Sequence, residues 1–446
     1  MKYKQYQKYK DSGVEWIGEI PEHWEVRKIK FNFEIKSGKT LQNSKKNEND
    51  LEVPYITAGN VFWENVDVDD LSTMRATPDE IKKYQVKNGD LLVCEGGESG
   101  RSAILQKIDF DCIIQNHVHR LRPMNGDSSG YLLYSLESIK DSGWFEVLTK
   151  RVTLSNLPSQ MLANMQIPIP SEKEQYSIYD FLKKETAQLD DIISKSQSQV
   201  NSLQEKRLVL ITNAVTKGLD PTVPMKDSGI EWIGDISEHW EVNKIKFTSY
   251  VKGRIGYHGL RADEFIDEGP YLITGTDFKD GGINWDTCYH VPEWRYDQDP
   301  FIQIKNNDIL VTKDGTIGKI AFIEELPGKT TLNSHLLTVR PLKNLYHSRY
   351  MYWIFLADYF TRYVNLVQSG SIMNAISQDK IENFVFALPP KTEQQQIYEF
   401  LDKETAQLDD IISKSQSQIN FLQEKRQVLI TSAVTGKIDV RNGVAA

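Results

Sequence analysis

The stretch KETAQLDDIISKSQSQV at residues 184–200 returns as KETAQLDDIISKSQSQI at residues 403–419. A second stretch, KDSGVEWIG at residues 10–18, returns as KDSGIEWIG at residues 226–234. The copies are offset by 219 residues for the first stretch and 216 residues for the second, so the repeat unit is about half of the 446-residue chain. Because the sequences between these stretches differ, the duplication predicts two similar frames that present two different surfaces in one fixed geometry.

The repeated stretch at residues 184–200 lies inside a long segment with the pattern of a coiled coil. From residue 172 to about residue 217, apolar residues recur at alternating spacings of three and four, and the second copy repeats this seam. Two long helices with the same seam are expected to pack on each other, and they must run antiparallel if a pseudo-twofold axis relates the two halves. The expected helix–helix seam contains Leu182, Leu189, Ile193, Leu203 and Leu210, and in the second copy Leu401, Leu408, Ile412, Leu422 and Leu429.

The residues before each long helix have the pattern of strands and turns, because Gly, Asn, Asp and Pro interrupt short apolar runs. Residues 84–93 and 302–311 each predict a hairpin, with a strand on both sides of an Asn-Gly or Asn-Asn turn. Trp24 and Trp240, in the repeated EHWEV element, are expected to be buried anchors. The sequence therefore predicts an α+β fold with two mainly-β domains, each followed by a long helix.

The expected domain boundaries follow from these segments and from the glycines that end the helices. They are 1–170 for the N-terminal mainly-β domain, 171–218 for the first long helix, 219–388 for the C-terminal mainly-β domain, 389–436 for the second long helix and 437–446 for a tail.

The composition indicates a soluble globular protein, with 39% hydrophobic residues and a formal net charge of −9. This acidic balance argues mildly against a surface that binds nucleic acid everywhere, although it permits a local basic groove. The three cysteines are far apart in sequence, which predicts reduced thiols, no zinc site and a cytoplasmic location. The sequence has no signal-peptide pattern and no run of 18 apolar residues, so no membrane association is expected.

Glycine-containing loops with a cation recur at equivalent places in the two copies. One pair is GGESGR at residues 96–101 and DGTIGK at residues 314–319, and another is KSGKT at residues 36–40 and KGRIG at residues 252–256. Glycines allow a ligand to approach the backbone, and the cations could contact phosphate. For the first pair, a tight hairpin with a solvated cation is an equally good interpretation. The recurrence of such loops in both diverged copies favours the phosphate contact.

Searches for catalytic motifs give no candidate. The sequence contains no phosphate-binding GxxxxGK[ST] loop, no GxGxxG element and no HExxH element. The carboxylates and lysine of PDEIK at residues 78–82 are too crowded for a metal site, which needs carboxylates that converge from separate elements. We therefore expect no catalytic residue and no metal ligand in this chain.

Three parts of the sequence together resemble the DNA specificity subunit of type I restriction-modification systems. They are residues 9–24, the NDILV and GTIG runs within residues 307–318, and LPPKTEQQQI at residues 388–397 before a long helix. The first half has IPSEKEQ at residues 169–175 instead, which keeps the Glu-Gln pair and lacks one proline. The resemblance covers nearly the whole chain.

This resemblance implies two target recognition domains, each of which reads one half of an asymmetric bipartite target in double-stranded DNA. The paired helices would set the gap between the half-sites and dock two modification subunits. The chain itself would be non-catalytic and bind no cofactor, because S-adenosylmethionine, ATP and Mg are used by partner subunits. A restriction or translocase subunit is left open as a further partner. The candidate DNA-binding residues are Lys36, Lys39, Asn60, Arg101, Arg151, Lys252, Arg254, Arg261, Lys313, Lys319 and Asn374.

Two other functional classes compete with this interpretation. A coiled-coil interaction scaffold that does not bind DNA would suit the acidic charge and the two long helices. An enzyme with a cryptic site is the third class, which the missing motifs disfavour.

Overall fold

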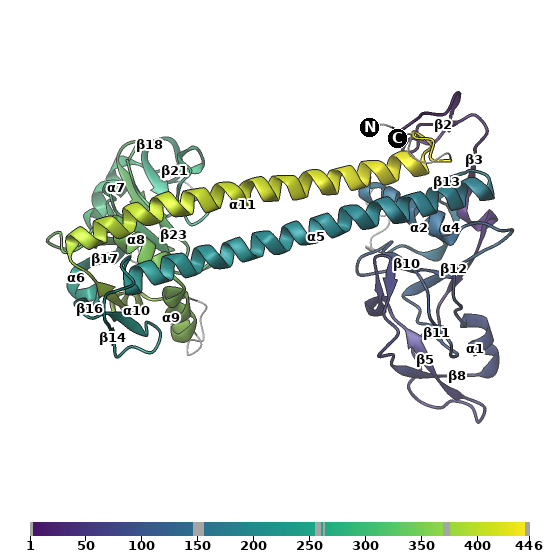
Figure 1. Cartoon of the computed structure of the whole chain (residues 1–446), viewed down its shortest axis with the longest axis horizontal. Helices are drawn as coiled ribbons and strands as arrows, with labels where there is room; N and C mark the ends of the chain where they lie inside the picture. The colour runs from purple at the N-terminus through teal and green to yellow at the C-terminus, as the bar shows by residue number, and fades with distance from the viewer. Residues whose placement is uncertain (1–2, 146–155, 255–259, 262–263, 369–374, 442–446) are drawn as a thin grey trace. The chain divides into compact units, whose positions relative to one another are not determined.

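The structure is a computed structural model that describes residues 3–145, 156–254, 260–261, 264–368 and 375–441. The chain divides into two compact units (Figure 1). Unit 1 consists of Met1–Ser196 and Ser417–Ala446, and unit 2 consists of Gln197–Gln416. Each unit thus contains one strand-rich domain, the first part of the long helix that follows this domain, and the last part of the other long helix.

Unit 1 is built around a four-stranded sheet and a three-stranded sheet. The four-stranded sheet has the order β10 (Ser102–Ile104), β9 (Leu91–Cys94), β12 (Val118–Pro123) and β4 (Phe33–Ser37), and the three-stranded sheet has the order β11 (Ile113–Ile114), β5 (Leu51–Ile56) and β8 (Thr73–Ala76). Paired short strands are β1 (Tyr9–Asp11) with β2 (Glu19–Pro21), β3 (Glu25–Lys28) with β13 (Gln166–Ile169), and β6 (Val61–Phe62) with β7 (Asn65–Val66). The helical segments are η1 (Ile29–Phe31), η2 (Ala58–Asn60), α1 (Pro78–Tyr84), α2 (Ser129–Asp141), α4 (Ser159–Asn164) and α5 (Glu172–Lys217), which continues into unit 2.

Unit 2 repeats these sheets with the same strand order. The four-stranded sheet has the order β23 (Ile320–Phe322), β22 (Ile309–Thr312), β25 (Leu336–Pro341) and β17 (Ser249–Gly253), and the three-stranded sheet has the order β24 (Thr330–Leu332), β18 (Ile266–Ile273) and β21 (Tyr289–His290). Paired short strands are β14 (Met225–Asp227) with β15 (Asp235–Ser237), β16 (Glu241–Lys244) with β26 (Val385–Leu388), and β19 (Phe278–Lys279) with β20 (Gly282–Ile283). The helical segments are α6 (Ile245–Thr248), η5 (Trp285–Thr287), α7 (Glu293–Gln298), η6 (Pro300–Ile302), α8 (Ser348–Leu356), α9 (Asp358–Gln368), α10 (Gln378–Glu382) and α11 (Lys391–Val434), which continues into unit 1. The expected α+β architecture is therefore confirmed in both copies.

Strand β9 is apolar along its whole length because it is buried on both faces. Its residues alternate between two cores, because successive side chains of a strand point to opposite faces. Leu91 and Val93 lie in the core that includes residues of α2, whereas Leu92 and Cys94 lie in the core shared with β5 and β11. All four residues are fully buried. A strand covered on both faces is apolar at every position, and not at alternate positions.

The predicted hairpins at residues 84–93 and 302–311 are wrong in their first strand. Tyr84 ends α1, and β9 pairs with β10 and β12 on its two sides. The turn itself forms, with Gly89 at φ 92°, and the buried Asp90 carboxylate accepts a hydrogen bond from the backbone N–H of Lys87 and pairs with Arg122. The same turn in unit 2 is held by Asp308 and Arg340. A turn signal fixes the local backbone, but it does not specify a strand before it.

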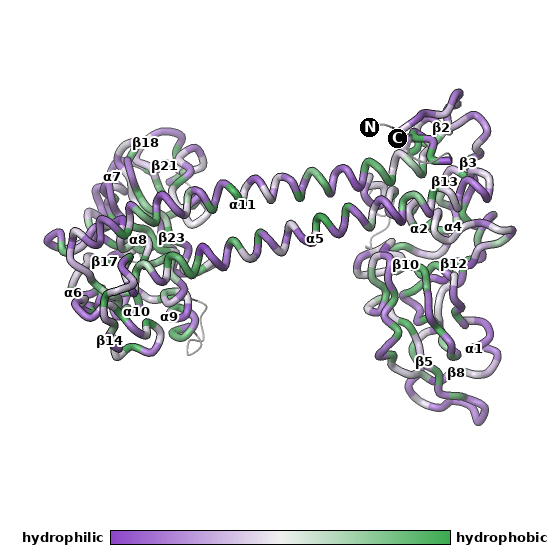
Figure 2. The backbone as a smooth tube through the Cα atoms, viewed as in Figure 1, coloured by the Kyte–Doolittle hydropathy of each residue, from purple (hydrophilic) through white to green (hydrophobic). Residues whose placement is uncertain are grey.

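The two long helices pack antiparallel within each unit. In each unit the start of one long helix lies beside the end of the other (Figure 1). Hydrophobic segments recur along both helices between hydrophilic ones (Figure 2). Leu182 of α5 is fully buried and shares a core with Leu429 of α11, which is 3% exposed. The expected seam residues are all buried or partly buried, namely Leu182, Leu189, Ile193, Leu203, Leu210, Leu401, Leu408, Ile412, Leu422 and Leu429. Every helix of the described residues is too short or too polar to cross a membrane.

The end of each long helix is buried against the tryptophan of the EHWEV element. Trp24 and Trp240 are both fully buried, as expected. Trp24 belongs to the core that contains the end of α11, and Trp240 belongs to the core that contains the end of α5. After α11, Gly436 has φ +73°, and a Cβ atom there would lie 2.3 Å from Cδ of Pro21. The apolar core of each unit therefore requires the end of the other repeat's helix.

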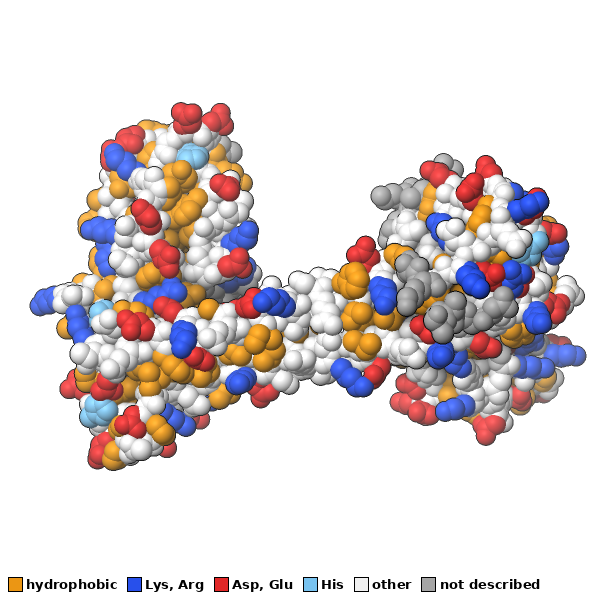
Figure 3. All heavy atoms as spheres, turned by 45° about the horizontal axis from the view of Figure 1, so that its top comes forward, with side chains coloured by type: hydrophobic (Ala, Val, Ile, Leu, Met, Phe, Trp, Pro, Cys, Tyr) orange, Lys and Arg blue, Asp and Glu red, His pale blue; other side chains and the backbone are white. Residues whose placement is uncertain are grey.

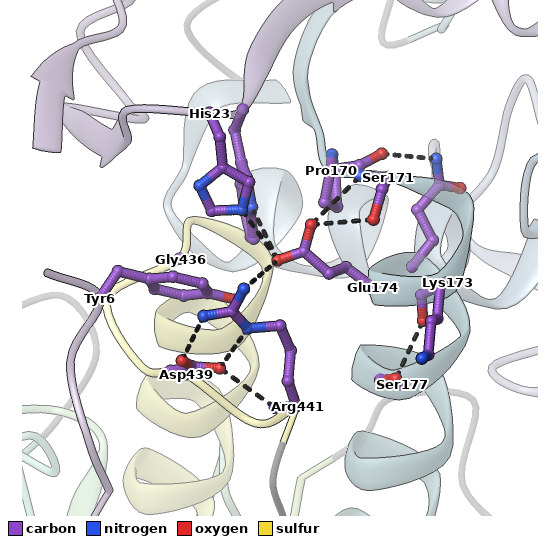
Figure 4. A network of polar contacts seen from close by, with 12 residues as sticks. Tyr6, His23, Pro170, Ser171, Lys173, Glu174, Ser177, Gly436, Asp439 and Arg441 are labelled. Carbon is purple, nitrogen blue, oxygen red and sulfur yellow. Dashed lines mark hydrogen bonds and ion pairs between the residues drawn. The ribbon is translucent and has the colours of Figure 1, made fainter. Parts of the chain in front are cut away.

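Glu174, the glutamate of the Glu-Gln pair, connects the start of α5 with the EHWEV element. Its carboxylate lies between His23, Ser171 and Arg441 (Figure 4), at 3.0 Å from Nε2 of His23 and 2.9 Å from Oγ of Ser171. Burial raises the pKa of Glu174, but the hydrogen bonds from His23 and Ser171 outweigh burial and leave the pKa below its usual value. The equivalent Glu393 accepts a hydrogen bond of 2.9 Å from the Trp240 indole.

The neighbouring glutamine of the pair holds the domain helix. Oε1 of Gln175 accepts a hydrogen bond of 2.9 Å from the backbone N–H of Ser128, the N-cap of α2. Oε1 of Gln394 accepts the same bond from His347, the N-cap of α8, at 2.8 Å. The Glu-Gln pair therefore links each long helix to both the EHWEV element and the strand-rich domain.

An arginine that continues the heptad spacing of the seam, four residues after Leu203 in α5 and after Leu422 in α11, connects both long helices with the strand-rich domain in each unit. In unit 1, Arg426 of α11 pairs with Asp190 of α5, with Glu137 of α2 and with Glu64 in the β6–β7 turn. In unit 2, Arg207 of α5 pairs with Asp409 of α11. We call these two clusters the arginine joints.

We predict that Gly436→Ala destabilises unit 1 more than Gly13→Ala does. Both glycines have φ +69° to +73°, so both substitutions strain the backbone, but only at residue 436 does the new Cβ meet Pro21 and Trp24. The added cost for Gly436→Ala is about 1–3 kcal/mol, the range for overpacking a well-filled core. Thermal unfolding followed by circular dichroism measures the difference, and equal losses in the two variants would contradict the docking of this helix end.

Glu137 makes the stability of unit 1 depend on pH. Burial raises the pKa of Glu137 to about 7, because it outweighs the opposing effect of the Arg426 guanidinium, and the nearby carboxylate of Glu64 adds to the rise. Because the folded state holds this proton more tightly than the unfolded state, the stabilisation is full below the usual glutamate pKa and is lost as the pH rises to about 7. We predict that Glu137→Gln removes a pH-dependent component of about 3 kcal/mol between pH 4.5 and pH 8.

Urea unfolding of the wild type and of Glu137→Gln at several pH values measures this component. The exposed Glu205→Gln provides the control, because its side chain lies on the helix surface and should leave the pH dependence unchanged. A Glu137→Gln variant with the same pH slope as the wild type would contradict a raised pKa at residue 137.

Candidate nucleic-acid interface

The first pair of glycine loops forms the tips of equivalent hairpins in the central sheets. Residues 96–101 lie in the connection from β9 to β10, and residues 314–319 lie in the connection from β22 to β23. The backbones are alike, because Gly97 and Gly315 both have positive φ, and so do the last glycines of both loops. Two hydrogen bonds, Gly100 N–H to Cys94 O and Gly318 N–H to Thr312 O, are also equivalent. The loops share a frame and differ in their side chains.

The two loops hold their cations differently. Arg101 donates a hydrogen bond of 2.7 Å to the carbonyl of Ala58, and its guanidinium lies 3.4 Å from Glu98 and over the ring of Phe62. Lys319 is exposed and has no carboxylate partner among the residues that the structure describes. Arg101 is therefore engaged within the fold, whereas Lys319 is available to a phosphate.

The loop of unit 1 is fastened through Glu98. Its carboxylate accepts a hydrogen bond of 3.0 Å from the indole N–H of Trp63 and pairs with Lys140 of α2. The hydrogen bond from Lys140 holds the pKa of Glu98 below its usual value. The position of this loop is thus tied to the β6–β7 turn and to α2.

The second pair of glycine loops contributes two cations to the interior. Lys39 is 7% exposed, and its Nζ lies 2.6 Å from Glu80. Arg254 is 3% exposed and pairs with Asp299 at 3.0 Å. At Gly38, a Cβ atom would lie 2.3 Å from the backbone carbonyl of Gln115. The glycine is therefore required by the close approach of two backbone segments and not by a ligand.

The other candidates are dispersed over the two units. Lys36 on β4 and Lys252 on β17 are equivalent and half-buried, and Lys313 is half-buried after β22. Asn60 accepts hydrogen bonds from the backbone and hydroxyl of Thr57 and so caps η2. Arg261 is exposed, whereas Arg151 and Asn374 lie outside the described residues.

A cleft in unit 2 brings the glycine loop against α9. It has a volume of about 390 Å³, and Gly315, Thr316 and Gly318 form one side of it. Asn365 and Gln368 of α9 are on the other side, and sequence reasoning missed them. The sequence pattern that could have identified them is a polar helix face. Thr361, Asn365 and Gln368 recur at spacings of four and three beside the apolar Phe360 and Val364.

Charge on the molecular surface is mixed. On the face that Figure 3 shows, Lys and Arg side chains alternate with Asp and Glu side chains in both units. No group of three or more His, Cys, Asp or Glu side chains within the described ranges could hold a metal ion. Among the described candidates, Arg261 and Lys319 are exposed, and the cleft presents hydroxyl and amide groups of Thr316, Asn365 and Gln368. These groups suit contacts with phosphates and with base edges.

Comparison with known proteins places these features in a family. The model of the type I restriction modification DNA specificity domain matches residues 21–202 and again residues 239–420. A putative type I restriction enzyme MjaX specificity subunit of Methanocaldococcus jannaschii is 25% identical over 432 residues, which cover 95% of this chain and 96% of that protein. The type I restriction enzyme StySPI specificity subunit of Salmonella potsdam is 22% identical, with 94% and 90% of the two chains covered.

A solved structure has the same fold. One chain superposes on this protein with a TM-score of 0.67 at 13% identity. It comes from a structure described as the structural basis underlying complex assembly and conformational transition of the type I R-M system. The match covers 94% of this chain and 99% of that chain. Because the family model matches most of the sequence in two successive copies, the protein belongs to the type I restriction-modification DNA specificity family, whose members are non-catalytic subunits that recognise DNA sequence.

Proposed function

We propose that each strand-rich domain of this specificity subunit reads one half of an asymmetric bipartite target in double-stranded DNA. The observation that supports this proposal is the duplication of the loop backbones with different side chains. A shared frame would place both loops against the duplex in the same way, and the different side chains would recognise different bases. The alternative of a scaffold that does not bind DNA disagrees with the family of the chain.

In unit 2 the contacts divide into positioning and reading. Lys313 and Lys319 are next in sequence to the loop that lines the cleft and would contact phosphates, which set the register of the domain on the duplex without reading sequence. Thr316, Asn365 and Gln368 can donate and accept hydrogen bonds, which is the chemistry that reads base edges in the major groove.

The outer surface of the long helices would dock two modification subunits. Packing requires that only the seam be similar in both helices, but outward-facing residues are identical as well. Ile192 and Ile411 are each 43% exposed. A repeated outer surface suits two copies of one partner. The exposed residues identical in both helices include Lys184, Gln188 and Lys195 in α5 and Lys403, Gln407 and Lys414 in α11.

The chemistry of the complex would belong to these partners. Methyl transfer from S-adenosylmethionine, and any step that uses ATP and Mg, would take place on modification or restriction subunits in the cytoplasm. This chain would contribute the DNA sequence to which they are directed and would bind no cofactor.

Lys319→Ala should weaken DNA binding without changing the recognised sequence. Loss of one phosphate contact reduces the slope of log K against log salt by about 1. Titration of the assembled complex with its target and with unrelated DNA at several salt concentrations measures this effect. The exposed Lys226→Ala in β14 is the control, and a loss of affinity for the target alone would contradict a phosphate contact.

Lengthening the helices should change the gap between the half-sites. Seven residues inserted at equivalent positions of α5 and α11 preserve the phase of the seam and add about 10 Å to the helix pair. We expect methylation at the same two half-sites with a gap that differs by about three base pairs, at 3.4 Å for each step of the duplex. Methylome sequencing measures the gap, and altered half-sites with an unchanged gap would refute the proposal.

A further inference from the structure

We infer that the arginine joints hold each recognition domain in one pose against the paired helices and thereby restrict the target to a single gap length. This inference rests on the proposed function, in which each strand-rich domain is a recognition domain. It assigns Arg426, Arg207 and their partners as positioning residues, which act on the gap and not on the bases.

The joint of unit 1 connects three elements with one guanidinium. Nε of Arg426 lies 2.8 Å from Asp190 of α5, Nη1 lies 2.5 Å from Glu137 of α2, and Nη2 lies 2.9 Å from Glu64. Nη1 and Nη2 donate charge-assisted hydrogen bonds to Glu137 and Glu64, whereas the contact with Asp190 is an ion pair. Charge-assisted hydrogen bonds are directional, so they fix an orientation that apolar packing alone leaves adjustable. The recognition domain of unit 1 is therefore attached to both long helices at one point.

The joint of unit 2 is built from the equivalent residues of the other helices. Arg207 of α5 contacts both oxygens of Asp409 of α11, at 2.8 Å and 3.2 Å. Its guanidinium also lies 6.0 Å from the ring centre of Trp353 on α8, and the Trp353 indole donates a hydrogen bond of 2.9 Å to Asp402 of α11. The joint therefore recurs in both units, although the domain side uses carboxylates in one and an aromatic ring in the other.

An arginine is a costly choice at this place. In α5 the neighbouring seam positions hold Val200 and Ala214, which are 2% and 3% exposed. An apolar residue at position 207 would extend this packing, whereas a polar residue at such a position weakens a coiled coil and specifies its arrangement. The occurrence of the same arginine and the same aspartate in both helices points to a positioning role.

Glu64 lies in the two-residue turn between β6 and β7 and has φ 61°. Asp280, in the equivalent turn between β19 and β20, has φ 51°. The left-handed conformation is therefore the one that a tight hairpin requires in both units. In unit 1 this turn presents the carboxylate of Glu64 to Arg426.

The joint of unit 1 is also connected to the candidate DNA loop. Trp63, beside Glu64, donates its indole N–H to Glu98 in the loop of residues 96–101. Lys140 of α2, one turn after Glu137, pairs with the same carboxylate. A rotation of the domain about the joint would therefore move the loop that faces the DNA.

The test uses unit 2, where Arg207 has one carboxylate partner among the described residues and both side chains of the pair are partly exposed. The variants are Arg207→Leu, which can pack in the seam, and Asp409→Asn, whose side chain is half exposed. The control is Asp235→Asn in β15, an exposed carboxylate of the same unit. Each variant is assembled with its modification subunits in cells, and methylome sequencing gives the distribution of gap lengths between the two half-sites.

We expect complexes with Arg207→Leu or Asp409→Asn to methylate sites whose gap is one base pair longer or shorter at least about tenfold more often than the wild-type complex does. This is the change that the loss of one charge-assisted hydrogen bond produces. The half-sites and the melting temperature should stay close to those of the wild type and of Asp235→Asn. A uniform loss of methylation with an unchanged gap would show that the joint is merely structural and would overturn the inference. Altered half-site bases would also overturn it, whereas a wild-type complex without any bipartite target would refute the proposed function instead.

Discussion

The structure depends on the burial of each helix end in the domain of the other repeat. The end of α11 completes the core around Trp24, and the end of α5 completes the core around Trp240. Neither strand-rich domain has a full core without this exchange, because the aromatic anchor would otherwise be exposed to water. The exchange also requires that the two helices run antiparallel within each unit, so packing and direction are set by the same contacts.

The polar residues around this exchange keep the frame constant while the loops vary. Glu174 and Gln175 connect the start of α5 with the EHWEV element and with the N-cap of α2, and Glu393 and Gln394 make the equivalent contacts in unit 2. These bonds involve buried or partly buried groups, which are costly to leave unpaired. A frame of this kind tolerates different glycine loops, since none of these contacts uses a side chain of residues 96–101 or 314–319.

The periodic elements were predictable from the sequence, whereas the candidate DNA-binding residues were predicted less well. The seam was readable because apolar residues that keep spacings of three and four over a segment of this length are typical of paired helices. Lys39 and Arg254 were chosen for charge beside glycine, but both are buried ion-pair partners. Asn365 and Gln368 gave no motif, since the cleft exists only after α9 packs beside the loop at residues 314–319.

By itself the sequence determined the duplication, the two long helices, the buried tryptophans and the family, because each of these is written in spacing or in repeated residues. Only the tertiary structure decided which cations are free, which strand each turn connects, and which domain each helix end completes. These properties depend on residues far apart in the chain, such as Arg426 with Glu64 and Glu137, and a side chain's partner is set by packing and not by its sequence neighbours.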